Sequence, residues 1–160
     1  NDPSIRIENV SERIRKLKDL GSWEQDRNIA EILVNRASNN PNITIEEVSK
    51  RIRGLKDLSS WERDKRIARI LVNRASNDPS IPIENVSDQI RGLEGLDPED
   101  RGPYIARILV NRASRDINTK IKPNTEELLI YKIIELCSDP TTLQRLLLEY
   151  IDSSEGSVSQ

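Results

Sequence analysis

Three arginines, Arg63, Arg66 and Arg69, stand three residues apart near the middle of the chain. On an α-helix this spacing places side chains on one side, so the guanidinium groups would form a basic stripe. Guanidinium groups bind phosphates and carboxylates through paired hydrogen bonds, so the stripe could contact a nucleic-acid backbone or an acidic peptide. The same groups could instead pair with acids of the protein itself, such as Glu62 and Asp64. Both interpretations stand.

The stripe has counterparts at a fixed distance along the chain in both directions. Toward the N-terminus the equivalent residues are Gln25, Asn28 and Glu31, which are polar or acidic rather than basic. Toward the C-terminus they are again basic or aromatic. A locally basic face that includes a tyrosine is the strongest candidate for a partner-binding surface. The candidate partner-binding residues are Arg63, Arg66, Arg69, Arg101, Tyr104 and Arg107.

A second polar pattern, Asn followed by Arg, lies beside the stripe in every copy of the segment ILVNRAS. This pair falls near the predicted end of a helix, where the last backbone carbonyls have no partner within the helix. Basic side chains at that position can donate hydrogen bonds to these carbonyls. We therefore expect a structural ladder that ties adjacent copies together. Its residues are Asn35, Arg36, Asn73, Arg74, Asn111 and Arg112.

No group of residues in the sequence indicates catalysis. The chain has no histidine, which removes imidazole chemistry and most zinc sites. Its one cysteine, Cys137, lies in an apolar helical segment, where a buried and inert thiol is the expected state. Glycine-rich phosphate loops and nucleophile motifs are absent. We expect a protein that is not an enzyme, with no cofactor, no metal and no small-molecule substrate.

The elements that position these residues repeat along the chain. The segment ILVNRAS begins at positions 32, 70 and 108, which gives a period of 38 residues. A period between about 20 and 50 residues is typical of a tandem helical array. The sequence thus predicts three repeats: repeat 1 over 1–38, repeat 2 over 39–76 and repeat 3 over 77–114.

Each repeat has the pattern of two helices. In repeat 2, Ile45, Val48, Ile52 and Leu55 follow the 3-4-3 spacing of one apolar helical face. A capping box at Ser59-x-x-Glu62 then predicts the start of a second helix. That second helix is apolar over most of its circumference near its end, so it needs neighbours on both sides, which stacked repeats supply.

The third repeat and the residues after it depart from the pattern. Gly102-Pro103 falls where the second helix should run, so we expect this helix to begin late, near Pro103. A linker over 115–124 follows, within a predicted C-terminal helical cap over 115–152 that gives the array a polar end. We expect the polar tail, 153–160, to be disordered.

A unit of two helices with this length resembles the tetratricopeptide, pentatricopeptide and octotricopeptide classes of repeat, over residues 1–114. The resemblance implies an all-α solenoid of αα-hairpins, wound as a right-handed superhelix. The tetratricopeptide W-x₂-L-G-x₂-Y pattern is absent, because Trp23 and Trp61 open second helices rather than first ones. No functional residue is therefore carried over from these families.

The architecture favours a non-enzymatic scaffold that binds a protein or peptide along its groove. The net charge of −2 agrees with this partner class and argues against a general nucleic-acid binder. The arginine stripe keeps a modular single-stranded RNA binder as an alternative. A further alternative is a spacer within a longer array. We expect no membrane span, a soluble intracellular protein, and a chain that is a fragment or processed product of a longer one.

Overall fold

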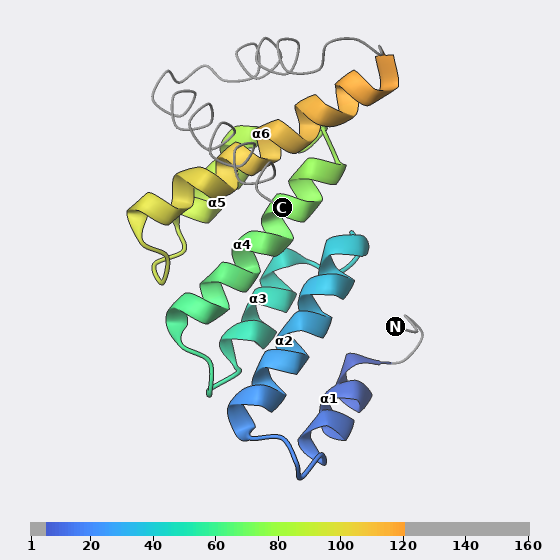
Figure 1. Ribbon diagram of the computed structural model, residues 1–160, viewed down its shortest axis with the longest axis vertical. Coiled ribbons are helices and arrows are strands. Elements are labelled where there is room, and N and C mark those ends of the chain that lie inside the picture. The colour runs from blue at the N-terminus through green and yellow to red at the C-terminus, as the bar shows by residue number, and fades with distance from the viewer. Residues whose placement is uncertain (1–5, 121–160) are drawn as a thin grey trace, which may run out of the picture. The chain divides into compact units, whose positions relative to one another are not determined.

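The computed structural model describes residues 6–120 of the chain (Figure 1), and every regular element in this range is an α-helix. Short and long helices alternate along the sequence. The short ones are α1 (Ile7–Arg15), α3 (Ile45–Arg53) and α5 (Ile83–Arg91). The long ones are α2 (Ser22–Asn39), α4 (Ser60–Asn77) and α6 (Pro98–Lys120).

The helices recur with the period of the sequence. The three short helices each have nine residues, and α2 and α4 each have 18. Each short helix starts 38 residues after the previous one, at residues 7, 45 and 83, and the long helices start at 22, 60 and 98. The all-α class is confirmed, and this regular alternation is consistent with a helical repeat.

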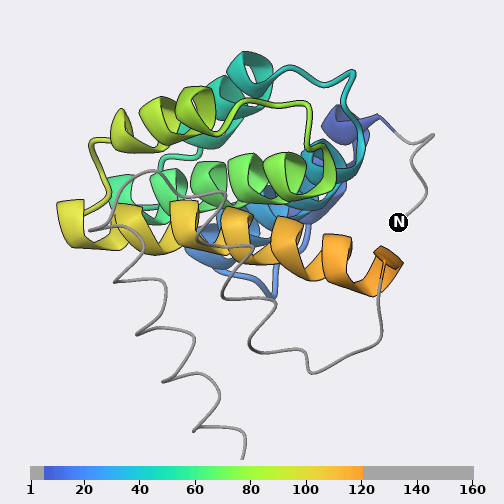
Figure 2. The same ribbon diagram turned by 90° about the horizontal axis from the view of Figure 1, so that it is seen from above.

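The chain forms two compact units. Within the described residues, the first contains those up to Arg74 together with Leu93–Leu96, and the second contains 75–92 and 97–120. In the first unit, α2 packs against both α1 and α3, and in the second, α5 packs against α6 (Figures 1 and 2). Helix α4 crosses the boundary between the units near its C-terminal end.

Side chains fix where the helices begin. Thr44 caps α3, because its hydroxyl accepts a hydrogen bond from the amide of Glu47 at 3.1 Å. Before α4, the amide of Ser59 donates to the Glu62 carboxylate at 2.9 Å, and the Glu62 amide donates to the Ser59 hydroxyl at 3.2 Å. The capping box predicted from the sequence is thus confirmed.

The apolar stripes of the helices form the core. In repeat 2, Val48, Ile52 and Leu55 of the predicted 3-4-3 face are all buried. The second helix of this repeat is buried over most of its C-terminal half, with Ile70, Leu71 and its neighbours inside the protein. Burying these side chains removes apolar surface from water, which stabilises this part of the helix.

The start of α6 differs from the expectation. We expected this helix to begin near Pro103, but it begins at Pro98 and Pro103 lies inside it. The donor that Pro103 lacks would have reached the carbonyl of Glu99, one residue into the helix. Glu99 is exposed, so water can donate a hydrogen bond to that carbonyl. The missing backbone hydrogen bond therefore affects only the first turns of the helix.

The end of α6 also differs from the expectation. Residues 115–120, which we assigned to a linker, continue the helix to Lys120. The rest of the predicted linker, most of the predicted cap over 115–152 and the tail 153–160 lie outside the described residues.

The burial pattern gives a testable difference between two equivalent isoleucines. Ile70 is fully buried in α4, whereas Ile32, at the same position of α2, is partly exposed. We expect Ile70→Ala to lower the free energy of unfolding by about 2–5 kcal/mol in urea titrations. Ile32→Ala, the matched control, should lower it by clearly less. Equal losses for the two variants would contradict the packing described here.

Candidate functional site

The arginines of the second-helix stripe are turned toward the protein. Arg63 donates from Nε to the carbonyl of Leu58 at 2.8 Å and from Nη1 to the carbonyl of Arg53 at 3.1 Å. Arg66 is only 8% exposed, and its Nη1 donates to the carbonyl of Glu62 at 2.9 Å. These two guanidinium groups therefore satisfy backbone acceptors of the same unit.

Arg69 is engaged by an acid from the preceding repeat. Its Nη1 donates to both carboxylate oxygens of Glu31, at 3.0 and 3.1 Å, and Nε of Arg66 lies 3.6 Å from the same carboxylate. Glu31 occupies in repeat 1 the position that Arg69 occupies in repeat 2. Because the residue at this position is an acid in repeat 1 and a base in repeat 2, the two side chains form an ion pair between α2 and α4.

The other three candidate residues lie on α6 in the second unit. Arg101 and Tyr104 are half-buried there, and Arg107 is exposed. The structure therefore does not turn the six candidates to solvent as one stripe. Of these six residues, Arg107 alone is exposed, and the other five are buried or half-buried.

The Asn-Arg pairs lie at the joins between repeats. The Nε of Arg74 donates to the carbonyl of Ala37 at 2.6 Å, and its Nη2 donates to the carbonyls of Asn40, at 2.9 Å, and Ile43. These acceptors belong to the last turn of α2 and to the loop before α3. One guanidinium thus donates to three backbone carbonyls where α2 ends and the following loop runs toward α3.

The same arrangement recurs in the second unit. Arg112 donates to the carbonyls of Ala75, Asp78 and Ile81, at 2.7, 3.1 and 2.8 Å. Burial lowers the pKa of the Arg74 guanidinium, and it lowers the pKa of Arg112 in the same way. The three contacts of Arg74 and the three contacts of Arg112 have the same spacings along the sequence, so the arrangement belongs to the repeat.

The asparagines of these pairs make the neighbouring contact. Asn73 donates from Nδ2 to the hydroxyl of Ser38 at 3.0 Å, and Asn111 donates to the hydroxyl of Ser76 at the same distance. In repeat 1, Asn35 is exposed and Arg36 is half-buried. The serines are the last residues of the ILVNRAS segments.

A buried aspartate that the sequence pattern did not indicate links two repeats. Asp26 is 1% exposed, and its Oδ2 accepts a hydrogen bond from the amide of Asp57, in the turn of the next repeat, at 2.9 Å. Its Oδ1 pairs with Nη2 of Arg15. A buried carboxylate needs partners of this kind, because an unpaired charge inside a protein is strongly unfavourable.

Asp64 makes the equivalent contacts one repeat later. Its Oδ2 accepts from the amide of Gly95 at 2.8 Å, and its Oδ1 lies 3.9 Å from Nη2 of Arg53. A Cβ at Gly95 would lie 2.6 Å from the carbonyl oxygen of Ser60, so only glycine fits there. The available signal in the sequence was an aspartate common to repeats 1 and 2, replaced by Gly102 in repeat 3.

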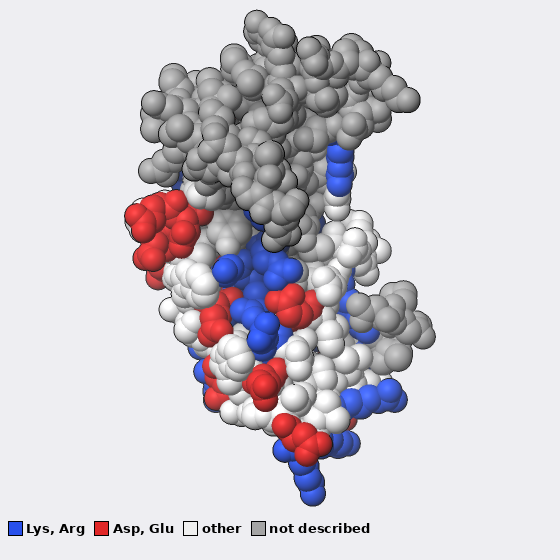
Figure 3. All heavy atoms as spheres, viewed as in Figure 1, with Lys and Arg blue, Asp and Glu red and all other residues white. Residues whose placement is uncertain are grey.

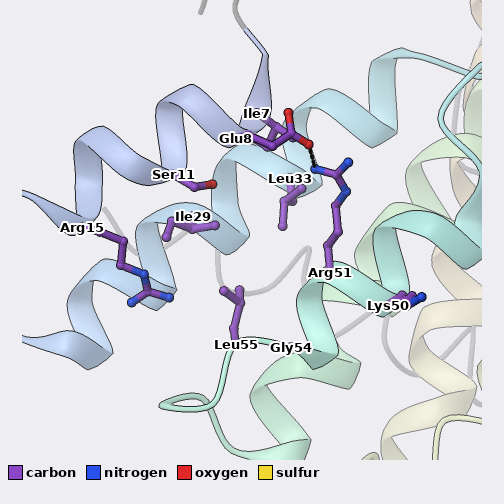
Figure 4. Close-up of a pocket in the computed structure, with 10 residues that line it drawn as sticks. All are labelled: Ile7, Glu8, Ser11, Arg15, Ile29, Leu33, Lys50, Arg51, Gly54 and Leu55. Carbon is purple, nitrogen blue, oxygen red and sulfur yellow. Dashed lines mark hydrogen bonds and ion pairs between the residues drawn. The ribbon is translucent and has the colours of Figure 1, made fainter.

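A hollow of about 280 Å³ opens in the first unit, where α1 and α3 pass over α2 (Figure 4). Ile29 and Leu33 of α2 and Leu55 after α3 give it an apolar floor. The rest of the lining comes from α1, from α3 and from Gly54 after it, and most of its side chains are polar or charged. We call this hollow the α1/α3 groove, and its lining comprises Ile7, Glu8, Ser11, Arg15, Ile29, Leu33, Lys50, Arg51, Gly54 and Leu55.

An ion pair crosses the α1/α3 groove. Nη1 of Arg51 donates to the Glu8 carboxylate at 2.6 Å, and its Nη2 donates to Glu47 at 3.1 Å. A hydrogen bond from its own backbone amide, and then the bond from Arg51, hold the pKa of Glu8 below its usual range. Charged side chains of both signs also stand side by side over the face drawn in Figure 3.

Comparisons of the chain with protein-family models, with curated proteins and with solved structures gave no match. Among residues 6–120, no helix combines the length and apolar character that a membrane crossing requires. In the same range, no three acidic, histidine or cysteine side chains gather as a metal site would need.

The buried aspartate supplies a sharp test of these contacts. Asp26→Ala should lower the free energy of unfolding by about 2–4 kcal/mol, because it leaves the Asp57 amide and Arg15 without their acceptor. The matched control is Asp57→Ala, which removes an exposed carboxylate and keeps the amide that Asp26 binds. We expect that control to stay within about 0.5 kcal/mol of the native chain. Similar losses in the two variants would contradict a stabilising role for the buried Asp26 carboxylate.

Proposed function

We propose that this protein is a non-enzymatic helical-repeat scaffold that binds a segment of another protein in the α1/α3 groove. The observation that carries the proposal is the groove itself, with an apolar floor and a charged rim on one side of the first unit (Figure 4). Helix-lined grooves of this composition bind peptides by taking an apolar side chain inside and pairing charges at the edge.

The size of the groove favours a peptide side chain over a free small molecule. Pockets for drug-sized ligands have volumes of about 300–1,000 Å³ and enclose most of the ligand. This groove, at about 280 Å³, lies below that range. It suits an aliphatic anchor residue whose backbone stays outside, in contact with the rim.

The rim favours acidic residues beside that anchor. Three basic side chains, those of Arg15, Lys50 and Arg51, line the groove with a single acid, Glu8. Arg15 and Arg51 already have carboxylate partners within the unit, and Lys50 is exposed. A peptide carboxylate near Lys50 would therefore gain an attractive interaction without displacing an existing ion pair.

The finer architecture belongs to the same proposal. We propose that the helix pairs stack as a right-handed solenoid, closed by a helical cap over 115–152. Stacked repeats place equivalent first helices beside one another along the array. The recurrence of the arginine caps at Arg74 and Arg112 supports this, because the same join is made in each unit.

Single-stranded RNA binding through the second-helix stripe has less support. A phosphate backbone needs exposed cations, and Arg63, Arg66 and Arg69 all bind acceptors of the protein. Binding RNA would require breaking those contacts. A spacer role predicts that neither a peptide nor RNA binds.

A random peptide library selected on the purified chain tests the proposal. We expect enriched peptides that carry an aliphatic residue flanked by Asp or Glu. Gly54→Leu should weaken their binding by about tenfold or more, because the new side chain fills the groove that Gly54 lines. Repeat 1 carries Lys16 at the same position, so the helix end accepts a side chain.

Gly92→Leu is the matched control, since Gly92 ends α5 with the same backbone conformation in the second unit. Its peptide affinity should equal that of the native chain. Failure to enrich any peptide, or equal loss in both variants, would refute the groove. Binding of random single-stranded RNA that falls steeply with salt would instead support the RNA alternative.

A further inference from the structure

Two exposed tryptophans mark an edge of the first unit. Trp23 is 43% exposed, and Trp61, at the same position of the next repeat, is 42% exposed. The Lys65 ammonium lies 4.4 Å from the centre of the Trp61 ring. The Arg27 guanidinium lies 5.5 Å from the centre of the Trp23 ring. Each indole is thus held by a cation one turn further along its helix, while much of the ring stays in water.

The exposure of these rings belongs to the repeat and not to an end of the array. Trp23 has repeat 2 beside it, because its Nε1 donates to the Glu62 carboxylate at 3.2 Å. Trp61 belongs to repeat 2 and has repeat 1 beside it. A ring with a neighbouring repeat after it and a ring with one before it are therefore equally exposed.

Further cations stand in the loops that lead to the two tryptophans. Lys18 and Lys56 occupy the same position of the two loops, and both are exposed. Among residues 6–120, neither these lysines nor Arg27 and Lys65 have a carboxylate partner. We call this surface the indole edge, and its residues are Lys18, Trp23, Arg27, Lys56, Trp61 and Lys65.

Repeat 3 carries different chemistry at the same positions. The lysine of the loop is replaced by Glu94, the tryptophan by Glu99 and the cation after it by Pro103. Helix α6 nevertheless starts at Pro98, in register with the other long helices. The start of a long helix therefore does not require the indole or its cations, so their role lies in a contact outside the helix.

The surroundings of the indole edge favour a short acidic segment over a nucleic acid. Each loop also holds an exposed aspartate, Asp19 or Asp57, whereas a long polyanion needs cations that no acid opposes. The cation over each ring also occupies a face on which a base would stack. A segment with a few carboxylates can pair with separate cations and place an apolar group against the exposed part of an indole.

The chain itself contains such a segment, over residues 92–100. Its sequence, GLEGLDPED, has four acids and no base. Glu94, Asp97, Pro98 and Glu99 are all exposed. Within the part of the chain that the structure describes, none of the four carboxylates pairs with a cation. We call residues 92–100 the acidic segment.

We propose that the indole edge binds the acidic segment of a second copy of this chain. Carboxylates of the segment pair with the cations of the edge, and Pro98 packs against an indole. Because the two surfaces differ, one copy offers its edge and the other its segment, so the association is head-to-tail. The indole edge shares no residue with the α1/α3 groove, so failure of peptide binding in the groove would leave this proposal standing.

Two variants that each lack one surface test the proposal. The edge variant carries Trp23→Glu and Trp61→Glu, which introduce the residue that repeat 3 has at this position. The segment variant carries Glu94→Lys and Glu99→Lys. In analytical ultracentrifugation, the native chain should associate as its concentration rises, and each variant alone should stay monomeric. An equimolar mixture of the two variants should form a 1:1 dimer, because each supplies the surface that the other lacks.

Tryptophan fluorescence locates the contact in the same mixture. Trp23 and Trp61 are the two tryptophans of the sequence, so the edge variant has none and all emission comes from the segment variant. We expect its emission to shift to shorter wavelength when the edge variant is replaced by native-edge partners in excess of the dissociation constant only if those partners keep the acidic segment; the edge variant, which keeps it, should therefore produce the shift.

A control variant adds the same charge elsewhere. Glu12→Lys with Asp88→Lys changes two exposed acids to the residue that repeat 2 carries at that position, Lys50. This variant should associate like the native chain. Circular dichroism first checks that every variant keeps the native helix content.

Three results would overturn the proposal. The first is a native chain that stays monomeric up to about 1 mM, which leaves no association of useful strength. The second is a mixture of the two variants that forms no dimer, or that forms one without a shift in tryptophan emission. The third is equal loss of association in the segment variant and the control variant, because overall charge and not the acidic segment would then control it.

Discussion

The guanidinium of Arg74 holds the end of one long helix to the start of the next short one. It donates to the carbonyls of Ala37, Asn40 and Ile43, which belong to the last turn of α2 and the loop that follows. Backbone carbonyls at a helix end are costly to bury without partners, and a fork of donors can serve several at once. Because Arg112 makes the same contacts in the second unit, each join is fixed in the same way.

Most of the charged side chains that the sequence suggested as binding residues instead make contacts within the protein. Asp26 holds the turn of the next repeat, and Glu31 collects the cations of Arg66 and Arg69. The α1/α3 groove remains as a surface where the described residues place apolar side chains beside an exposed cation, that of Lys50.

The sequence was informative wherever the cause was local. The 3-4-3 stripe of α3 and the capping box at Ser59 depend on residues within two turns of one another, so their spacing predicts them directly. The predicted start of α6, near Pro103, was wrong. The effect of a proline depends on its distance from the helix start, which the sequence pattern did not determine. The partners of Arg66 and Arg69, and the burial of Asp26, depend on which sides of two distant helices meet. Composition and spacing do not contain that information.

The central claim is that one arginine closes each join between repeats, and the stability of Arg74 variants tests it most directly. Denaturant unfolding should show a loss of about 2–4 kcal/mol for Arg74→Ala, because three carbonyls lose a charged donor. Arg74→Lys should recover only a minor part, since an ammonium group cannot span the same three acceptors. Lys56→Ala, at an exposed position of the same unit, should change little. Native-like stability of Arg74→Lys or Arg74→Ala would contradict the account.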